Sequence, residues 1–148
     1  MPYKPSTGYR LCGVPDVVRV TNAVLRRLRQ EARSTPDKEC CGLLAGSDQT
    51  ITVIYPAPNA CDAPDAYEIA PVELFRLMRE IHSRRLELLG IYHSHPTGEN
   101  RPSRRDIERA YYPDAAYFIL SPRPDAPQSV RAFSIHDGGV SELLIEVV

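Results

Sequence analysis

Three features that mark specialised classes of protein are missing from this sequence. No run of apolar residues is long enough to cross a bilayer, and the first residues, MPYKPSTGYRLCG, lack the apolar stretch of a signal peptide. The net charge is only −1, with 18 basic and 19 acidic residues interspersed along the chain. Surfaces that bind nucleic acid or membranes usually carry an excess of positive charge, so we expect neither partner.

Paired cysteine motifs are missing as well. The four cysteines, Cys12, Cys40, Cys41 and Cys61, show no C-x-x-C spacing, and the adjacent pair is awkward to join in a disulfide. We therefore expect the protein in a reducing cytoplasm. Cys40 stands beside Glu39 and could in principle bind a metal or act as a redox switch. We expect neither role, because neighbouring residues on a strand point to opposite faces.

What is present is the composition of an ordinary globular domain. The 148 residues are 43% hydrophobic and 25% charged, which is enough to bury one core. Residues 1–15 contain several prolines and glycines, so we expect an irregular arm there and a single domain at 16–148.

Apolar periodicity predicts a mixture of strands and helices. Strands are expected at 17–20, 41–46, 51–55, 67–70, 88–95, 115–121, 130–136 and 140–148, and helices from Thr21 or Asn22, from Pro71, and at 103–112. The second helix has one apolar stripe, made of Leu74, Phe75, Met78 and Ile81. We expect Tyr111 and Tyr112 to pack. Hairpin succession at the end of the chain favours a mixed α/β (α+β) fold, with a curved, mostly antiparallel sheet flanked by helices.

The stretch IYHSHPTGENRPSRRD, at 91–106, places two histidines one residue apart. On a strand His93 and His95 project to the same side, so both imidazoles could bind one cation. Asp106 follows at the start of the next helix and could supply a third ligand, leaving a fourth position for water, as in catalytic zinc sites. Two simpler interpretations remain open. The histidines could lie on the surface, and Ser103 with Asp106 could form only a capping box.

The same stretch resembles the signature of the JAMM/MPN+ metalloprotease family, H-[ST]-H-P-x(6)-S-x-x-D. Every fixed position is filled, by His93, Ser94, His95, Pro96, Ser103 and Asp106. The segment TPDKECCGLLAG supplies Glu39 in the E-x-C-G setting of the family, and the similarity extends from about Val17 to the C-terminus. The resemblance implies the cytidine-deaminase-like MPN architecture.

The resemblance also implies a set of roles. His93, His95 and Asp106 would bind Zn²⁺, Glu39 would act as general base on the metal-bound water, and Ser103 would donate a hydrogen bond to the oxyanion. Short prokaryotic members resemble enzymes that process sulfur-carrier proteins. The implied activity is therefore a zinc metallopeptidase that cleaves an amide after the C-terminal glycine of a ubiquitin-like protein and releases cysteine or another amine.

The expected substrate has a Gly-Gly tail, which would add as a strand beside a sheet edge that leads into the site. Only a short link follows Asp106, so the insertion of ubiquitin-chain-cleaving relatives is missing. An exposed sheet edge would also permit a homodimer. The alternatives are a non-catalytic MPN scaffold and a peptidase for unrelated, cell-wall-type peptides. A zinc deaminase is excluded, because the sequence has neither H-x-E nor P-C-x-x-C.

Overall fold

The computed structural model describes residues 16–148, so the expected arm at 1–15 and Cys12 lie outside the described residues. The elements follow in the order β1 (Val17–Val20), α2 (Asn22–Ser34), β2 (Cys41–Ser47), β3 (Thr50–Ala57), α3 (Pro71–Ser83), β4 (Glu87–Ser94), α4 (Arg104–Glu108), β5 (Ala116–Leu120), β6 (Val130–His136) and β7 (Gly139–Val147).

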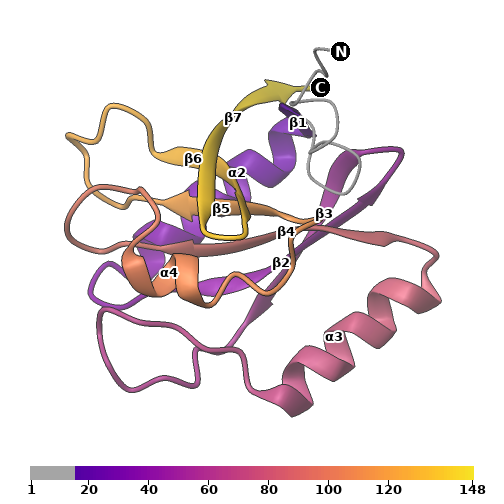
Figure 1. Cartoon of the computed structure of the whole chain (residues 1–148), viewed down its shortest axis with the longest axis horizontal. Coiled ribbons are helices and arrows are strands. Elements are labelled where there is room, and N and C mark those ends of the chain that lie inside the picture. The colour runs from indigo at the N-terminus through magenta and orange to yellow at the C-terminus, as the bar shows by residue number, and fades with distance from the viewer. Residues whose placement is uncertain (1–15) are drawn as a thin grey trace, which may run out of the picture.

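The strands form one curved sheet that closes on itself, in the order β1-β3-β2-β4-β5-β6-β7 (Figure 1). The pairs β2–β3, β2–β4, β5–β6 and β6–β7 are antiparallel, and β1–β3, β4–β5 and β1–β7 are parallel. This confirms the curved, mostly antiparallel sheet flanked by helices. The closure by β1 was not expected. It joins the two ends of the sheet, so the exposed edge that suggested a homodimer is not available there.

Helices cover the two faces of the sheet and bury separate apolar clusters. Helix α2 begins at the N-cap Thr21, whose hydroxyl accepts a hydrogen bond from the Val24 backbone at 3.3 Å. It buries Val24, Leu25 and Leu28 in the first cluster, together with Phe118. Helix α3 covers the other face, where Leu77 and Ile81 join the second cluster (Figure 1). His93 and His95 lie at the end of β4, which runs from Glu87 to Ser94.

Three expectations about local structure are wrong. Residues 67–70 are not a strand, because no neighbouring strand pairs with them among the described residues. Helix α4 ends at Glu108 rather than near 112, since the Tyr111 backbone donates to the Arg109 carbonyl and the Tyr112 backbone donates to the Tyr117 hydroxyl.

The third error concerns side-chain burial. In α3 the buried positions are Leu77 and Ile81, whereas Phe75 of the predicted stripe is 64% exposed. Tyr112 packs against the second cluster as expected, but Tyr111 is 72% exposed.

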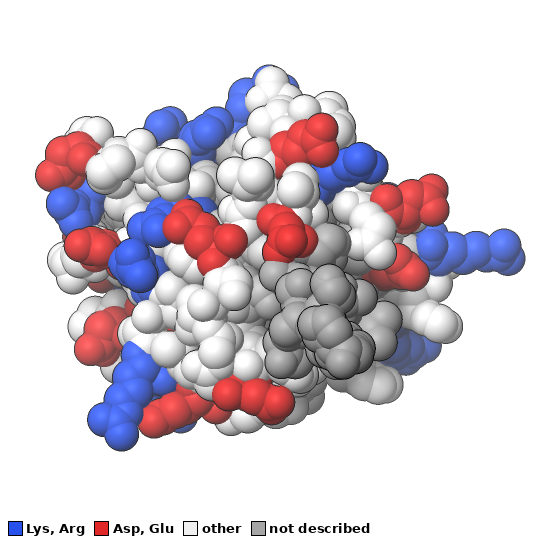
Figure 2. Space-filling view, turned by 45° about the horizontal axis from the view of Figure 1, so that its top comes forward, with Lys and Arg blue, Asp and Glu red and all other residues white. Residues whose placement is uncertain are grey.

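The surface carries charges of both signs. Figure 2 shows acidic and basic side chains interspersed over one face, without a broad area of a single sign. Within residues 16–148 no helix combines the length and apolar character needed to span a bilayer.

Candidate metal centre

Strand β4 brings the two motif histidines to the edge of the core. His93 is 1% exposed and is held between neighbouring strands, where it pairs with Cys41 of β2 and Ile119 of β5. His95 follows directly after the strand, and its backbone N–H donates to the Leu120 carbonyl at 2.9 Å. Both rings therefore have a fixed backbone beneath them.

Helix α4 supplies Asp106 from a capping box. The Ser103 hydroxyl oxygen accepts from the Asp106 backbone at 3.1 Å, and Asp106 Oδ2 accepts from the Ser103 backbone at 2.9 Å. The same Oδ2 lies 3.2 Å from His93 Nε2 and 3.1 Å from His95 Nε2. The capping interpretation and the ligand interpretation of Asp106 are therefore compatible.

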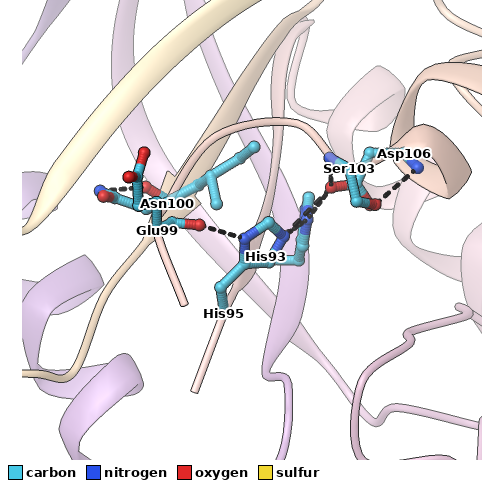
Figure 3. Close-up of polar contacts among 7 residues, drawn as sticks. His93, His95, Glu99, Asn100, Ser103 and Asp106 are labelled. Carbon is cyan, nitrogen blue, oxygen red and sulfur yellow. Dashed lines mark hydrogen bonds and ion pairs between the residues drawn. The ribbon is translucent and has the colours of Figure 1, made fainter. Parts of the chain in front are cut away.

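The three candidate ligand atoms form a nearly equilateral triangle with sides of 3.1 to 3.2 Å. Figure 3 shows the three side chains turned toward one another. The third side, between the Nε2 atoms of His93 and His95, is 3.2 Å. Zinc lies about 2.0–2.1 Å from histidine nitrogen, so two corners of its tetrahedron are about 3.3–3.4 Å apart. The observed spacing matches that edge, and among the described residues these three are the one group placed to share a metal ion. The residues fit Zn²⁺.

The orientation of His95 is set by the loop after β4. Its Nδ1 lies 2.8 Å from the Glu99 carbonyl, and because a carbonyl only accepts, Nδ1 carries the proton and Nε2 keeps a lone pair for a metal. Buried Asn100 holds this loop, since its amide donates to the Ile119 and Gln128 carbonyls at 3.2 and 2.9 Å. Asn100 carries no motif signal, and the sequence analysis missed it.

His93 is positioned in a different way. The ring of Tyr67 stacks on it, with centroids 4.4 Å apart and 18° between the planes. Its Nδ1 is buried and has no hydrogen-bond partner among residues 16–148. Sequence analysis missed this contact, because Tyr67 was placed in a strand that does not form.

Asn59 organises the segment that carries Tyr67. Its amide nitrogen donates to the carbonyls of Glu39 and Ala66, both at 3.0 Å. Its oxygen accepts from the backbone of Cys61 at 2.9 Å and of Glu68 at 3.0 Å. One side chain thus ties the residue expected to act as base to the loop that covers His93.

Glu39 lies just before β2 and is buried, at 6% exposure. Its Oε1 has no hydrogen-bond partner in the described part of the chain. Burial raises its pKa to about 7, an effect that His95 opposes and Asp106 reinforces. The carboxyl group of Glu39 therefore interacts electrostatically with His95 and Asp106, and its pKa lies near neutrality.

The charges of the three candidate ligands depend strongly on one another. Burial alone raises the pKa of Asp106, but the contacts of its carboxylate with the rings of His93 and His95 outweigh it and hold that pKa well below its usual range. Burial lowers the pKa of His93. Burial also opposes protonation of His95, but its contacts with Asp106 and the Glu99 carbonyl raise the pKa overall. Asp106 is therefore a carboxylate, and the side chains in the cluster are of the types that bind zinc.

Ser94, between the two histidines, joins β4 to the segment of Glu39. Its hydroxyl accepts from the Cys40 backbone at 2.9 Å, and its own N–H donates to the Cys40 carbonyl at 3.1 Å. Burial raises the pKa of the Cys40 thiol, and the ligand cluster contains no cysteine.

The JAMM class of metalloprotease-like domains is defined by a curved α/β sheet. In this class the end of one strand and the helix that follows it bring two histidines and an aspartate together. The chain belongs to the family described as prokaryotic homologs of the JAB domain, which matches residues 21–136.

Named relatives and a solved structure agree with this assignment. The chain is 38% identical over 104 residues to the desampylase of Haloferax volcanii, covering 68% of this chain and 75% of that protein. It is 36% identical over 132 residues to the CysO-cysteine peptidase of Mycobacterium tuberculosis, covering 87% of each. The solved structure of protein DSY2949 from Desulfitobacterium hafniense is 29% identical, with a TM-score of 0.77 over 88% of this chain and 92% of that one. These similarities support a hydrolase.

Proposed function

We propose that this chain is a zinc-dependent peptidase that hydrolyses the amide bond after the C-terminal glycine of a ubiquitin-like sulfur-carrier protein, releasing cysteine or another amine. The observation that carries the proposal is the cluster of His93, His95 and Asp106 beside buried Glu39, with all three ligand atoms within 3.2 Å of one another. The relative named CysO-cysteine peptidase supports the substrate class. We expect the reaction to take place in the cytoplasm. The thiols of Cys40, Cys41 and Cys61 are free, which accords with a reducing compartment.

In this proposal His93, His95 and Asp106 hold the metal. Bound Zn²⁺ would lower the pKa of a coordinated water to near 7 and polarise the substrate carbonyl. The stacked ring of Tyr67 and the hydrogen bond from His95 Nδ1 to the Glu99 carbonyl keep both imidazoles oriented. Such supporting contacts matter because they preserve ligand geometry through the catalytic cycle.

Glu39 transfers the proton. Its carboxylate takes a proton from the attacking water and passes it to the nitrogen of the departing amine as the C–N bond breaks. A group whose pKa lies near the working pH is suited to both steps, and burial raises the pKa of Glu39 to about 7. The Asn59 amide fixes the backbone of Glu39 and therefore the position of the base.

Ser103 stabilises the negative charge that develops on the substrate oxygen. Its hydroxyl oxygen accepts from the Asp106 backbone, which uses a lone pair and leaves the hydroxyl proton free to donate. Donors of this kind are worth roughly 3–4 kcal/mol in other hydrolases.

The segment 67–70 offers backbone groups to the substrate tail. Both backbone groups of Glu68 are used, since its N–H donates to Asn59 Oδ1 and its carbonyl accepts from Ala60. The backbone groups of Tyr67 and Ile69 bond to no described residue, and both residues line a hollow beside Asp106. We propose that the tail pairs with this segment instead of with an edge of the closed sheet.

Mass spectrometry of a carrier protein tests the proposal. Purified protein loaded with Zn²⁺ should remove the cysteine from CysO that carries one at its C-terminus. Glu39→Gln should retain zinc and lose at least about 100-fold in kcat, because it removes a general base. Glu108→Gln, an exposed substitution on α4, serves as the matched control and should cleave normally. Full activity of Glu39→Gln would exclude the proposed base.

The Gly-Gly requirement needs a separate substrate. Replacing the penultimate glycine of the carrier by valine should abolish cleavage, because a branched side chain would meet the stacked rings of Tyr67 and His93 at the approach to the metal. An unchanged rate would refute the proposed tail specificity.

A further inference from the structure

We propose that Arg105 binds the carboxylate of the amino acid that leaves from the glycine tail, and that the chain therefore favours leaving amines with a carboxylate next to the nitrogen. The inference rests on the proposed function and names a specificity-determining residue of the same site. It is carried by the place of Arg105 on the cavity wall, by its lack of an ion-pair partner among residues 16–148, and by the charges around the cavity.

Arg105 lies on the wall of the cavity that adjoins the candidate metal ligands. It directly precedes Asp106 in α4, and both residues line the hollow of about 410 Å³. Arg109 lines the same hollow. Positions 105 and 109 are one helical turn apart, so the two side chains leave α4 on the same side. Two cationic side chains are therefore neighbours at the part of the recess next to the proposed metal.

The fold does not use these two positive charges. Arg104, which precedes Arg105, is paired with Glu108, with its Nε 3.2 Å from Oε2. The side chains of Arg105 and Arg109 are exposed, and neither forms an ion pair or a hydrogen bond with any residue in 16–148. Their charges are therefore available to a ligand in the cavity.

Another part of the cavity wall carries negative charge. The segment 66–69 lines the hollow and contributes Glu68, and Asp65 precedes this segment. A carboxylate that enters the recess is repelled by these acidic residues and attracted by Arg105 and Arg109. The charges thus direct an anionic group of the substrate to the side of α4, while the glycine tail pairs with the backbone of the segment 67–70.

Arg105 also lies close enough to the proposed base to influence its charge. Burial raises the pKa of Glu39 to about 7, and Arg105 is among the charged groups that lower it. Glu39 is the group expected to protonate the departing nitrogen. In a C-terminal amino acid a single carbon separates this nitrogen from the carboxylate, so a nitrogen beside Glu39 brings the carboxylate to the neighbourhood of Arg105.

The chemistry of arginine fits this ligand. A C-terminal carboxyl group has a pKa of about 3.3, so it is ionised at neutral pH. A guanidinium group can donate two parallel hydrogen bonds to such a carboxylate. The side-chain amine of a lysine has only methylene groups beside its nitrogen, so an isopeptide bond offers no carboxylate at this position. An acidic side chain in the tail of the carrier protein is the competing ligand of Arg105, and the experiment distinguishes the two.

Two substrates that differ only in one charge test the inference. They are CysO with a C-terminal cysteine and CysO with a C-terminal cysteinamide, and mass spectrometry measures kcat/KM of the zinc-loaded protein for each. The wild type should prefer the carboxylate form by about 10-fold or more, as expected for a hydrogen bond between charged groups. Arg105→Gln should lose this preference by slowing the carboxylate form alone. Arg104→Gln, the matched control on the same helix, should keep it.

Two kinetic outcomes would overturn the inference. Equal rates of the wild type on both substrates would show that the carboxylate is not recognised. An equal loss on both substrates in Arg105→Gln would show that Arg105 supports the fold or binds an acidic residue of the tail.

A binding measurement separates this inference from the proposed function. Zinc-loaded Glu39→Gln is titrated by calorimetry with the same two forms of CysO, with and without Arg105→Gln. If the wild type cleaves neither form, the proposed function fails, but tighter binding of the carboxylate form that Arg105→Gln abolishes would still support the contact. Equal binding of the two forms would overturn the contact, and no binding of either form would overturn both proposals.

Discussion

At the residue scale, Asp106 shows that a local and a functional interpretation of one side chain can both hold. Its Oδ2 closes the capping box with the Ser103 backbone and also faces both histidine Nε2 atoms. The sequence predicted each role separately, because the pattern S-x-x-D is typical of a capping box and also forms part of the JAMM/MPN+ signature. In the structure the capping box fixes the direction of the Asp106 carboxylate, so the start of α4 orients the proposed ligand.

Glu39 gives the first prediction at this scale, for protein stripped of metal. Its folded pKa of about 7 lies above its usual value of 4.5 because of burial. The protonated form is therefore favoured by folding. That stability is fully present below pH 4.5 and is lost as the pH rises through 7. Each pKa unit corresponds to about 1.4 kcal/mol, so the full difference between 4.5 and about 7 is at most about 3.5 kcal/mol.

Urea unfolding of chelator-treated protein at pH 5 and pH 8 measures this effect. As the pH rises from 5 to 8, the unfolding free energy of the wild type should fall by about 2 kcal/mol more than that of Glu39→Gln, because glutamine does not ionise. Other carboxylates titrate in both proteins and cancel in the comparison. Parallel pH profiles of the two proteins would contradict the buried, unpaired position of the Glu39 carboxyl group.

At the element scale, regular patterns predicted most of the fold. Strands β1 and β6 occupy the expected residues, and α2 and α3 start where the caps and Pro71 placed them. The segment 67–70 failed because a strand requires a partner, and local sequence carries no information on which backbone lies beside it. The Asn59 contacts were unpredictable for the same reason, since they join residues as far apart as 20 positions.

Asn59 therefore provides the prediction at the element scale. Asn59→Asp keeps the acceptor for the Cys61 and Glu68 backbones but replaces the two donations to the Glu39 and Ala66 carbonyls by repulsion. Leaving such groups unpaired should cost about 1–3 kcal/mol of unfolding free energy. The added negative charge should also raise the pKa of Glu39 and move the acid limb of kcat to higher pH.

The core substitution Ile135→Val on β6 is the control for simple loss of stability. Ile135 is 1% exposed, and this change usually costs about 0.5–1.5 kcal/mol. It should lower the melting temperature and leave the pH profile of kcat in place. If Asn59→Asp behaves in the same way, Asn59 supports the fold without positioning the base.

At the scale of the whole molecule, sheet register brings the site together. Cys41 pairs with His93 across β2 and β4, so Glu39 lies near the histidines although 54 positions separate it from His93. The resemblance predicted which residues converge, but not the closure that holds the sheet in a ring. That closure pairs Val17 with Leu144, and contacts over such a separation leave no local pattern in the sequence.

This convergence predicts that metal and fold stability are coupled. The proposed ligands lie on β4, just beyond it, and on α4, so they meet only in the folded chain. A metal that binds the folded state alone stabilises that state. At a free concentration 1,000 times the dissociation constant, the gain is about 4 kcal/mol. For a domain of this size, excess chelator should then lower the melting temperature by roughly 10 °C.

Asp106→Asn separates the metal effect from the cap. The amide oxygen of asparagine can still accept from the Ser103 backbone, so α4 should keep its first turn, while the anionic ligand is lost. The variant should therefore have the same melting temperature with and without chelator, and this temperature should be close to that of the metal-free wild type. His82→Gln, which alters an exposed histidine of α3, should retain the full response. If neither zinc nor chelator changed the melting temperature of the wild type, the three side chains would meet without sharing an ion. The proposed hydrolysis would then lose its chemical basis.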